Sequence, residues 1–588
     1  MVVPIHHWGR PLDAYVTSYT RDKMTSRLPE SDDPQRLALG RQIIKKICSV
    51  THVPPASPEI SVSDLLEVLN LSRSPAGYSL FSNSRLISGS VRLMSRLPRS
   101  QAGRHAPFSY EYGYLCFRII ILALGMSIID RTKGYSRLLI EDMTTHLNVK
   151  PISCFSLHIS RVVVDYINHA TGVGRSRYTY NCVLGWLRCS DCPKMSELVS
   201  RSDASMLLRM ISDDDKQFIK SMLWTYSPGL SGVVYLLWGY VRNEQYLQDH
   251  PNPNRFIVPF MIIFFRCILC STPDQALALA TIHLANFRAA QLWTYLLRPL
   301  DLRPELADSR LMMHAFIHQL NLGILPTDGE RPLPIEEVPD ALDFLYRHFV
   351  PGCQDIIPEL IGATIQRCWV IFLNPSMMAA FPAIFTATFS WFRAFIEELR
   401  QPTLENKSLK SKVLTFAIDN DLVDFIGRIM VLINPTPPKR KDSENSEDFL
   451  KECEELRIVL SSLHPGTELE NYFVARGMGW WKFYWHLRYL ADLPSDDPRH
   501  AMFYNTCANT WASLRPSVNP NDLSSGTEYH MCSYDRCPNP EIPWGLGYVC
   551  DTYGANVYCG TTCLQRDWEL RMSRGSEGFN RSHSHALH

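Results

Sequence analysis

Apolar residues recur at helical spacing along most of the 588-residue chain. The pattern is clearest in four segments, which cover residues 64–72, 274–300, 340–350 and 468–493. Strict alternation of apolar and polar residues, the mark of a half-buried strand, is hard to find, and so are the turn dipeptides of β-hairpins. The pattern therefore predicts a mainly α protein. Because no fixed repeat period is visible, we expect an irregular multi-helix array or solenoid.

Capping signals give the expected ends of two of these helices. Ser63 precedes the leucine-rich segment 64–72 and is an acceptable N-cap. Pro273 suits the first turn of the helix expected over 274–300, because a proline there gives up no intrahelical hydrogen bond. Pro299 is expected to end that helix, since proline cannot continue the hydrogen-bond ladder.

Three long apolar runs raise the question of a membrane span. The runs 119–129 and 256–265 are too short, because a spanning helix needs about 20 apolar residues. The run 368–392 carries no charged residue, but an Asn-Pro-Ser turn signal at 374–376 divides it. We therefore expect two buried helices there and no membrane partner.

Two polar stretches interrupt the helical pattern. Residues 434–448 are proline-rich, then basic, then acidic, and contain no apolar side chain to bury. Residues 514–530 separate the body from a cysteine-rich end. The expected organisation is a helical body over 1–433, a disordered loop or linker over 434–448, a helical continuation of the body over 449–513, a linker over 514–530, a cysteine-rich segment over 531–572 and a flexible tail over 573–588.

Charge and cysteine usage narrow the class of partner and compartment. Lys+Arg and Asp+Glu both number 59, so the formal net charge is zero, and no nucleic-acid partner is expected. The region 526–588 has five arginines, no lysine and seven acidic residues, which argues the same way. The N-terminal residues lack an apolar export signal. We therefore expect an intracellular protein, cytoplasmic or nuclear, whose 17 cysteines are reduced.

The most specific signal is a cluster of cysteines near the C-terminus. "CSYDRC" supplies Cys532 and Cys537, and "CGTTC" supplies Cys559 and Cys563. Two close pairs of thiolates can complete one tetrahedral zinc site, so one Zn²⁺ is expected. An iron–sulfur cluster also uses four cysteines, and a chance group of reduced thiols is a further alternative. The fold class predicted for the whole chain is thus a helical array with a small, zinc-stapled C-terminal finger.

Residues 531–572 resemble a MYND-type zinc finger. Cys532 and Cys537 match the first cysteine pair of that family, although four residues separate them instead of two. Tyr558-Cys559 and Cys563 match its "YC-x3-C" pair, and Asp567-Trp568 matches the polar residue and tryptophan that follow. The resemblance implies that the first and third pairs share one zinc ion. It covers only the C-terminal segment, and the body of the chain is not recognised.

The second metal site of that family is incomplete in this chain. Cys550 stands where the second pair begins, but the partner position is Tyr553. The late histidine and cysteine positions hold Arg571 and Gly575. Cys550 is therefore expected to be a vestige, because a lone thiolate does not hold structural zinc. Three histidines of the tail are conceivable substitutes, and they are His583, His585 and His588.

The resemblance implies a role in protein–protein recognition. Trp568 matches the tryptophan that, in some members, helps to form a groove for proline-containing peptides. An extended proline-rich segment loses little entropy when it docks on an aromatic face. The chain's own "NPTPP" at 434–438 is one candidate ligand. The alternative for Trp568 is simple packing on the metal-binding turns.

The alternative function is an enzyme with an unrecognised active site in the helical body. No phosphate-binding loop, dinucleotide fingerprint, nucleophile elbow or kinase motif is present, so no catalytic residue is proposed. Some MYND-type fingers belong to SET-type lysine methyltransferases, but a helical body does not fit that β-rich fold. The sequence favours a binding protein over an enzyme.

Overall fold

The computed structural model describes the greater part of the chain. The described residues are 8–20, 33–50, 60–99, 103–132, 134–145, 151–171, 183–186, 196–247, 254–288, 305–322, 333–372, 381–400, 404–433, 440–463, 477–493, 495, 497–513, 529–532, 534, 537, 541–543, 548–549 and 557–573.

The chain divides into two compact units. Unit 1 comprises Met1–Arg303 with Gly329–Pro332, and unit 2 comprises Pro304–Asp328 with Leu333–His588. The body expected over 1–433 therefore contributes to both units, whereas the cysteine-rich segment belongs to unit 2.

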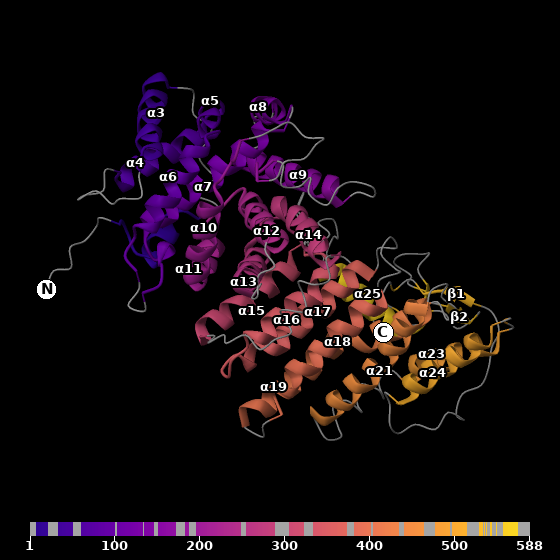
Figure 1. Cartoon of the computed structure of the whole chain (residues 1–588). Helices are drawn as coiled ribbons and strands as arrows, with labels where there is room; N and C mark the ends of the chain where they lie inside the picture. The colour runs from indigo at the N-terminus through magenta and orange to yellow at the C-terminus, as the bar shows by residue number, and fades with distance from the viewer. Residues whose placement is uncertain are drawn as a thin grey trace, which may run out of the picture. The chain divides into compact units, whose positions relative to one another are not determined.

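Unit 1 consists of helices, coloured from indigo to magenta in Figure 1. Its elements are α1 (Leu12–Tyr15), η1 (Val16–Ser18), α3 (Pro34–Cys48), α4 (Val62–Asn70), η2 (Leu71–Arg73), α5 (Pro75–Tyr78), η3 (Ser79–Phe81), α6 (Ser84–Ser95), η4 (Pro107–Ser109), α7 (Glu111–Asp130), α8 (Tyr135–Thr145), α9 (Pro151–Thr171), α10 (Arg201–Asp213), α11 (Asp215–Trp224), α12 (Leu230–Leu247), α13 (Asn254–Cys270) and α14 (Pro273–Arg288).

Helix α7 is the central element of unit 1. Every residue of α7 except Asp130 is buried, and α4, α6, α9 and α12 pack around it. A helix that is apolar on all sides requires such an environment. The apolar run 119–129 is thus part of a 20-residue helix, the one helix among the described residues that is long and apolar enough to cross a membrane. Its complete burial inside the unit accounts for its composition.

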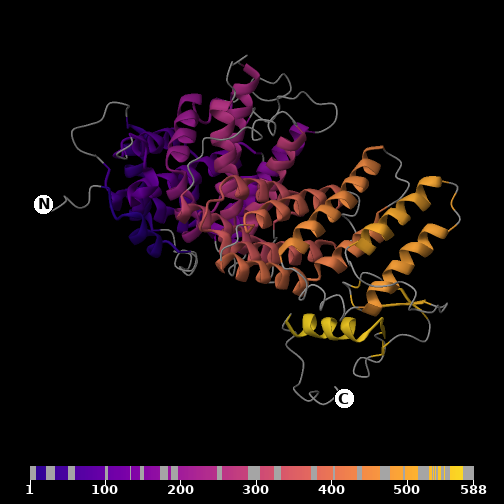
Figure 2. The ribbon, with the colours of Figure 1, turned by 90° about the horizontal axis from the view of Figure 1, so that it is seen from below.

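Unit 2 begins with helices and ends with short strands and a last helix, shown from pink to yellow in Figure 2. Its elements are α15 (Leu306–Asn321), η7 (Ile335–Glu337), α16 (Val338–Arg347), η8 (Gln354–Ile356), α17 (Ile357–Phe372), α18 (Phe381–Glu397), α19 (Leu404–Asp419), α20 (Leu422–Leu432), α21 (Arg440–Leu463), α23 (Gly477–Asp492), α24 (Pro498–Ser513), β1 (Tyr529–Met531), β2 (Glu541–Pro543), β3 (Tyr548–Val549), β4 (Val557–Tyr558) and α25 (Thr561–Ser573).

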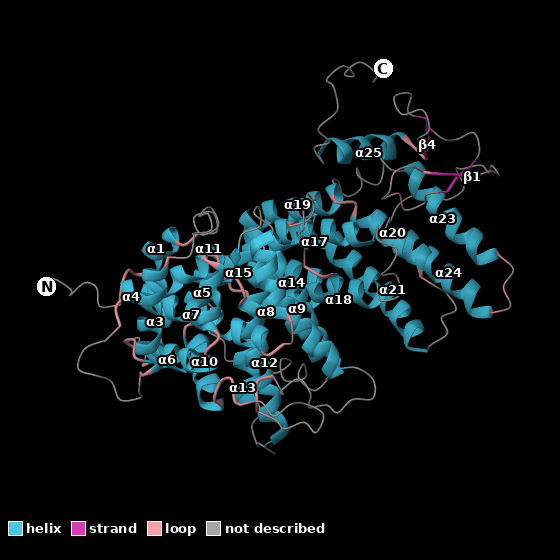
Figure 3. Cartoon of the chain, turned by 90° about the horizontal axis from the view of Figure 1, so that it is seen from above, coloured by secondary structure: helices cyan, strands magenta, loops and turns pink. Residues whose placement is uncertain are grey.

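The helices of unit 2 form a stacked array. Helices two places apart in sequence pack together: α15 on α17, α17 on α19, and α16 on α18, while α18 also packs on α21. The aromatic ring of Phe425 on α20 lies 5.0 Å from Trp369 and 4.8 Å from Phe385, measured between ring centroids. The predicted irregular helical array is confirmed. Within the described residues, strands occur only between 529 and 558, beside α25 (Figure 3).

The predicted helices are present, with ends that differ in detail. The helix expected over 64–72 begins at Val62, because Ser61 is its cap and forms a reciprocal capping box with Asp64. Helix α14 begins at Pro273 as expected, but residues 289–304, which include Pro299, lie outside the described residues. The uncharged run 368–392 is shared by α17 and α18, and the turn expected at 374–376 also lies outside them.

The prediction of a disordered loop or linker over 434–448 is wrong for residues 440–448. Residues 440–448 form the start of α21, while 434–439 lie outside the described residues. Four of these nine residues are Arg, Lys or Glu, which lose little side-chain freedom in a helix, and the segment extends a helix whose apolar residues begin only at Phe449. The linker expected over 514–530 also ends early, because Tyr529 and His530 belong to β1. Residues 514–528 lie outside the described residues, as do 574–588 of the expected tail.

Candidate metal centre

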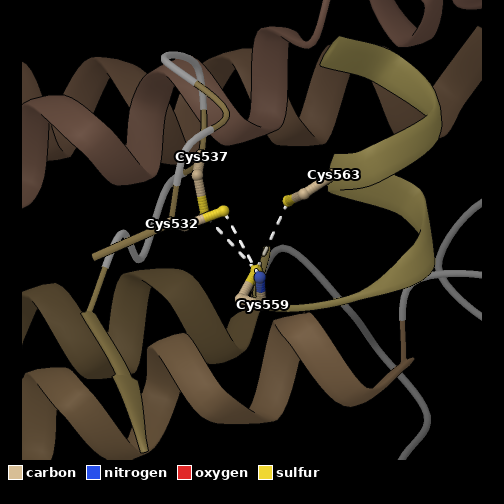
Figure 4. A group of neighbouring side chains, drawn as sticks. All are labelled: Cys532, Cys537, Cys559 and Cys563. Carbon is tan, nitrogen blue, oxygen red and sulfur yellow. Dashed lines mark hydrogen bonds between the residues drawn. The ribbon is translucent and has the colours of Figure 1, made fainter. Parts of the chain in front are cut away.

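Four cysteine side chains of unit 2 converge on one point. Cys532 directly follows β1, and the N–H of Cys537 donates to the carbonyl oxygen of Tyr534 at 2.9 Å. Cys559 directly follows β4, and Cys563 lies in the first turn of α25. Figure 4 shows the four side chains pointing toward one another. Two strand pairs, β1 with β2 and β3 with β4, hold the ends of these segments.

The spacing of the sulfur atoms suits a single metal ion. All four Sγ atoms lie within 4.8 Å of one another. The Sγ of Cys559 is 3.5 Å from that of Cys537 and 3.4 Å from that of Cys563. Four thiolates arranged tetrahedrally, each about 2.3 Å from an ion, would lie roughly 3.8 Å apart. None of the four thiols is joined in a disulfide, so each can serve as a ligand.

The cysteine cluster is partly buried, and a backbone N–H group that can stabilise a thiolate points at one of its sulfur atoms. Cys532 and Cys537 are buried, together with Tyr534 and Tyr558. The backbone N–H of Cys559 donates to the Sγ of Cys532 at 3.4 Å. Such hydrogen bonds stabilise thiolate ligands and fix their orientation. The position of Cys563 at the N-terminus of α25 favours its thiolate further, because the helix dipole is positive there.

The crowding of the four thiols spreads their proton affinities apart. Hydrogen bonds from Cys537, Cys559 and Cys563 lower the pKa of Cys532. The pKa of Cys563 is raised, chiefly by its hydrogen bond to Cys532. Neighbouring thiolates repel one another, so some members of the group keep a proton unless a cation compensates their charge. A divalent cation bound here would displace those protons.

A buried hydrogen bond connects the strand end that precedes Cys559 with helix α25, which carries Cys563. The hydroxyl of Tyr558 donates to Oδ2 of Asp567 at 2.7 Å, and both side chains are buried. Tyr558 precedes Cys559, and Asp567 lies one helical turn beyond Cys563. The bond therefore fixes the strand end relative to α25. Sequence reasoning singled out Asp567 only as the neighbour of Trp568, whereas its carboxylate has this positioning role.

The metal centre is docked on the helices of unit 2. Asp421 lies between α19 and α20 and is only 2% exposed. The hydroxyl of Tyr534 donates to its Oδ2, and the guanidinium of Arg566 lies 2.6 Å from its Oδ1. The same guanidinium faces the carbonyl oxygens of Ile418 and Asp419, at 3.4 and 3.3 Å. The segment expected to be a separate module beyond a linker is thus bonded to the helical array.

Sequence reasoning did not find these docking residues. Tyr534 lies inside "CSYDRC" and Arg566 inside "CLQRDW", so both could be named as neighbours of ligands. Asp421 carries no local signal, because its partners are more than 100 positions away. Arg428 on α20 adds a hydrogen bond from its guanidinium to the carbonyl oxygen of Cys537, at 3.3 Å.

The remaining predicted site residues have different outcomes. Cys550, expected as a vestige of a second site, lies outside the described residues, as does Tyr553. Trp568 lies on α25 with 36% of its surface exposed. Next to it, the amide of Gln565 donates to Oε1 of Glu569 at 2.9 Å. The outward side of α25 thus presents one large aromatic side chain among polar groups.

Comparison with known proteins adds no name to this site. No protein-family model matches the chain, and neither a curated protein nor a solved structure matches it. The chemistry of the site therefore follows from its own geometry: four thiols close enough together to bind a metal ion.

Proposed function

We propose that Cys532, Cys537, Cys559 and Cys563 hold one zinc ion and that residues 531–572 form a MYND-type finger. The observation that carries this proposal is the convergence of the four Sγ atoms within 4.8 Å. Zinc prefers four tetrahedral ligands in structural sites, and thiolates are among its best. The zinc ion would supply charge compensation for the thiolates and join two segments with little apolar surface of their own.

Elemental analysis of the purified full-length chain distinguishes zinc from iron. Both metals accept four thiolates, so the ligand set alone does not choose between them. We expect zinc and no acid-labile sulfide. Iron with sulfide would keep the ligands but replace the proposed finger by an iron–sulfur centre.

The function that we propose for the whole chain is protein–protein recognition on a helical scaffold. Trp568 supports it, since a large aromatic side chain that remains 36% exposed on a short helix offers an apolar face to a partner. A proline-containing peptide suits such a face, because its extended conformation is already formed before binding. The proposed partner is therefore a protein segment of that chemistry.

A peptide array probed with the full-length, metal-loaded chain tests this function. Trp568→Ala should abolish the binding of proline-rich peptides, because it removes the aromatic face. Trp224→Ala is the matched control, since Trp224 is 43% exposed but lies in unit 1, outside the finger. If both variants bind as the original chain does, or if proline-rich peptides never bind, the recognition proposal fails.

A further inference from the structure

Asp421, which joins the cysteine cluster to the start of α20, has an unusual backbone conformation. Asp421 has a φ of 56° and a ψ of 37°, and it is the one residue other than glycine with positive φ among those that the structure describes. An aspartate at this N-terminal position usually caps its own helix. The carboxylate of Asp421 makes no such capping bond and instead binds Tyr534 and Arg566.

The neighbouring residue, Asn420, is held by a different helix, α17. We refer to Asn420 and Asp421 together as the α19–α20 turn. The side-chain amide of Gln366 donates to Oδ1 of Asn420, and the indole N–H of Trp369 donates to its backbone oxygen at 3.0 Å. Both donors lie on α17. The α19–α20 turn is therefore fixed between the helical array and the metal centre.

The contact residues from the metal centre are placed by the ligands themselves. Tyr534 lies between Cys532 and Cys537, and Arg566 lies three residues after Cys563 on α25. When an ion fixes the four sulfur atoms, it also fixes the positions from which Tyr534 and Arg566 reach Asp421. A short segment with a small core depends on such a staple for its own folding.

We propose that metal binding at the four cysteines is thermodynamically coupled to the conformation of the α19–α20 turn. This inference rests on the proposed metal site. The loaded centre holds the Asp421 carboxylate and thereby stabilises the left-handed conformation that begins α20. In return, Asp421 and Arg428 stabilise the loops that carry the cysteines. Coupling of this kind is reciprocal, so a change that stabilises the turn strengthens metal binding by the same free energy.

The strained backbone conformation of Asp421 predicts how the turn changes when the metal is lost. A non-glycine residue in the left-handed region costs about 1 kcal/mol or more, and that conformation persists only where the surroundings enforce it. Loss of the metal would release Tyr534 and Arg566, two of the groups that enforce it. The first turn of α20 should then open more often, while helices remote from the contact keep their stability.

Hydrogen exchange of the full-length chain, with and without removal of zinc by a chelator, tests the coupling. The amide of Phe425 is the reporter, because it donates to the carbonyl oxygen of Asp421 at 2.9 Å. We expect its exchange to accelerate by about tenfold on metal removal. This factor corresponds to the loss of one hydrogen bond to a charged group, here the bond from the Tyr534 hydroxyl to the Asp421 carboxylate. Amides of α16 serve as the internal reference and should not change.

A conservative variant tests the same inference without removing the metal. Tyr534→Phe deletes only the hydroxyl that binds Asp421. It should weaken zinc affinity, measured by competition with a chromophoric chelator, by about tenfold and accelerate exchange at Phe425 in the zinc-loaded chain. Tyr346→Phe is the matched control, because Tyr346 on α16 donates at 3.1 Å to Glu398, the residue that follows α18 in unit 2. It should leave both quantities unchanged.

The outcomes separate this inference from the proposed function. A chain that binds no metal overturns both. A chain that binds zinc, but whose exchange at Phe425 is the same with and without it, overturns only the coupling. Equal effects of Tyr534→Phe and Tyr346→Phe on zinc affinity also overturn it, because general destabilisation of unit 2 would then explain the result.

Discussion

Cys559 contacts the other three cysteines of the cluster through both its side chain and its backbone. Its Sγ faces the sulfurs of Cys537 and Cys563, and its N–H donates to the sulfur of Cys532. It also follows Tyr558, whose hydroxyl anchors the strand end to α25. One residue thus joins both cysteine pairs through its side chain and its backbone.

The first prediction concerns the loss of this thiol. Cys559→Ala removes one of four ligands and should abolish metal binding and expose the C-terminal segment to proteases. Cys550→Ala should have little effect, because the other ligands of a second site are absent from the matching positions. Limited proteolysis of the full-length variants measures both. Equal sensitivity of the two variants would contradict the assignment of Cys559 to an intact site and of Cys550 to a lost one.

Asp214 shows how burial acts on a single residue of unit 1. It lies between α10 and α11, and its Oδ2 accepts a hydrogen bond from the N–H of Phe108 at 2.7 Å. Burial raises the pKa of Asp214 to about 8, against the opposing effect of that hydrogen bond. The folded chain therefore binds a proton at this carboxyl over a pH range in which the unfolded chain has released it.

The second prediction is a pH dependence of stability that follows from this shift. The carboxyl titrates near pH 4 in the unfolded chain, roughly, so its contribution to stability is complete below that value. The contribution is lost as the pH rises to about 8, the pKa of the folded state. Asp214→Asn should flatten this decline in urea denaturation measured from pH 5 to pH 8. Parallel curves for both chains would contradict the assignment.

Among the elements, helix α6 illustrates what close packing demands. Gly89 faces α3, and a Cβ atom at this position would lie 2.1 Å from the backbone oxygen of Ile47. A backbone atom cannot give way as a flexible side chain can. The approach of α3 to α6 therefore requires glycine here.

The third prediction tests this contact. Gly89→Ala should destabilise unit 1 by about 1–3 kcal/mol, because the two helices must separate. Gly232→Ala in α12 is the matched control, since its Cβ would meet only a methyl group of Ile159 at 3.3 Å. The control should change stability by no more than about 1 kcal/mol, since alanine also has the higher helix propensity. Urea unfolding followed by circular dichroism measures both; a larger loss in the control would contradict this account of the packing.

The same elements show how far the sequence could predict the structure. Helices such as α4, α14 and α16 were predictable from apolar residues at helical spacing, with a capping box at the start of α4 and a first-turn proline in α14 and α16. The start of α21 was not, since residues 440–448 carry no apolar face, and their helix continues into the stripe around Phe449. That the cysteines of "CSYDRC" and "CGTTC" lie in one cluster was predictable from their spacing in the sequence. The docking on Asp421 was not, because it joins residues that no local pattern relates.

In the whole molecule, the buried carboxylate of Asp421 joins the helices of unit 2 to the candidate metal centre. The zero formal net charge argued against a nucleic-acid partner. Neither charge nor composition carries information about contacts between residues far apart in the sequence. The sequence could suggest a finger at the end of the chain. It could not show that the four-cysteine cluster belongs to unit 2, whose helices hold its segments through Asp421 and Arg428.

The central claim is that one metal ion occupies the group of four cysteines. Native mass spectrometry of the full-length chain tests it most directly, with Cys559→Ala as the reference for the metal-free mass. The account predicts one zinc ion per chain, lost completely in the variant. Two ions per chain would contradict the single-site claim, and the absence of bound metal would contradict the finger itself.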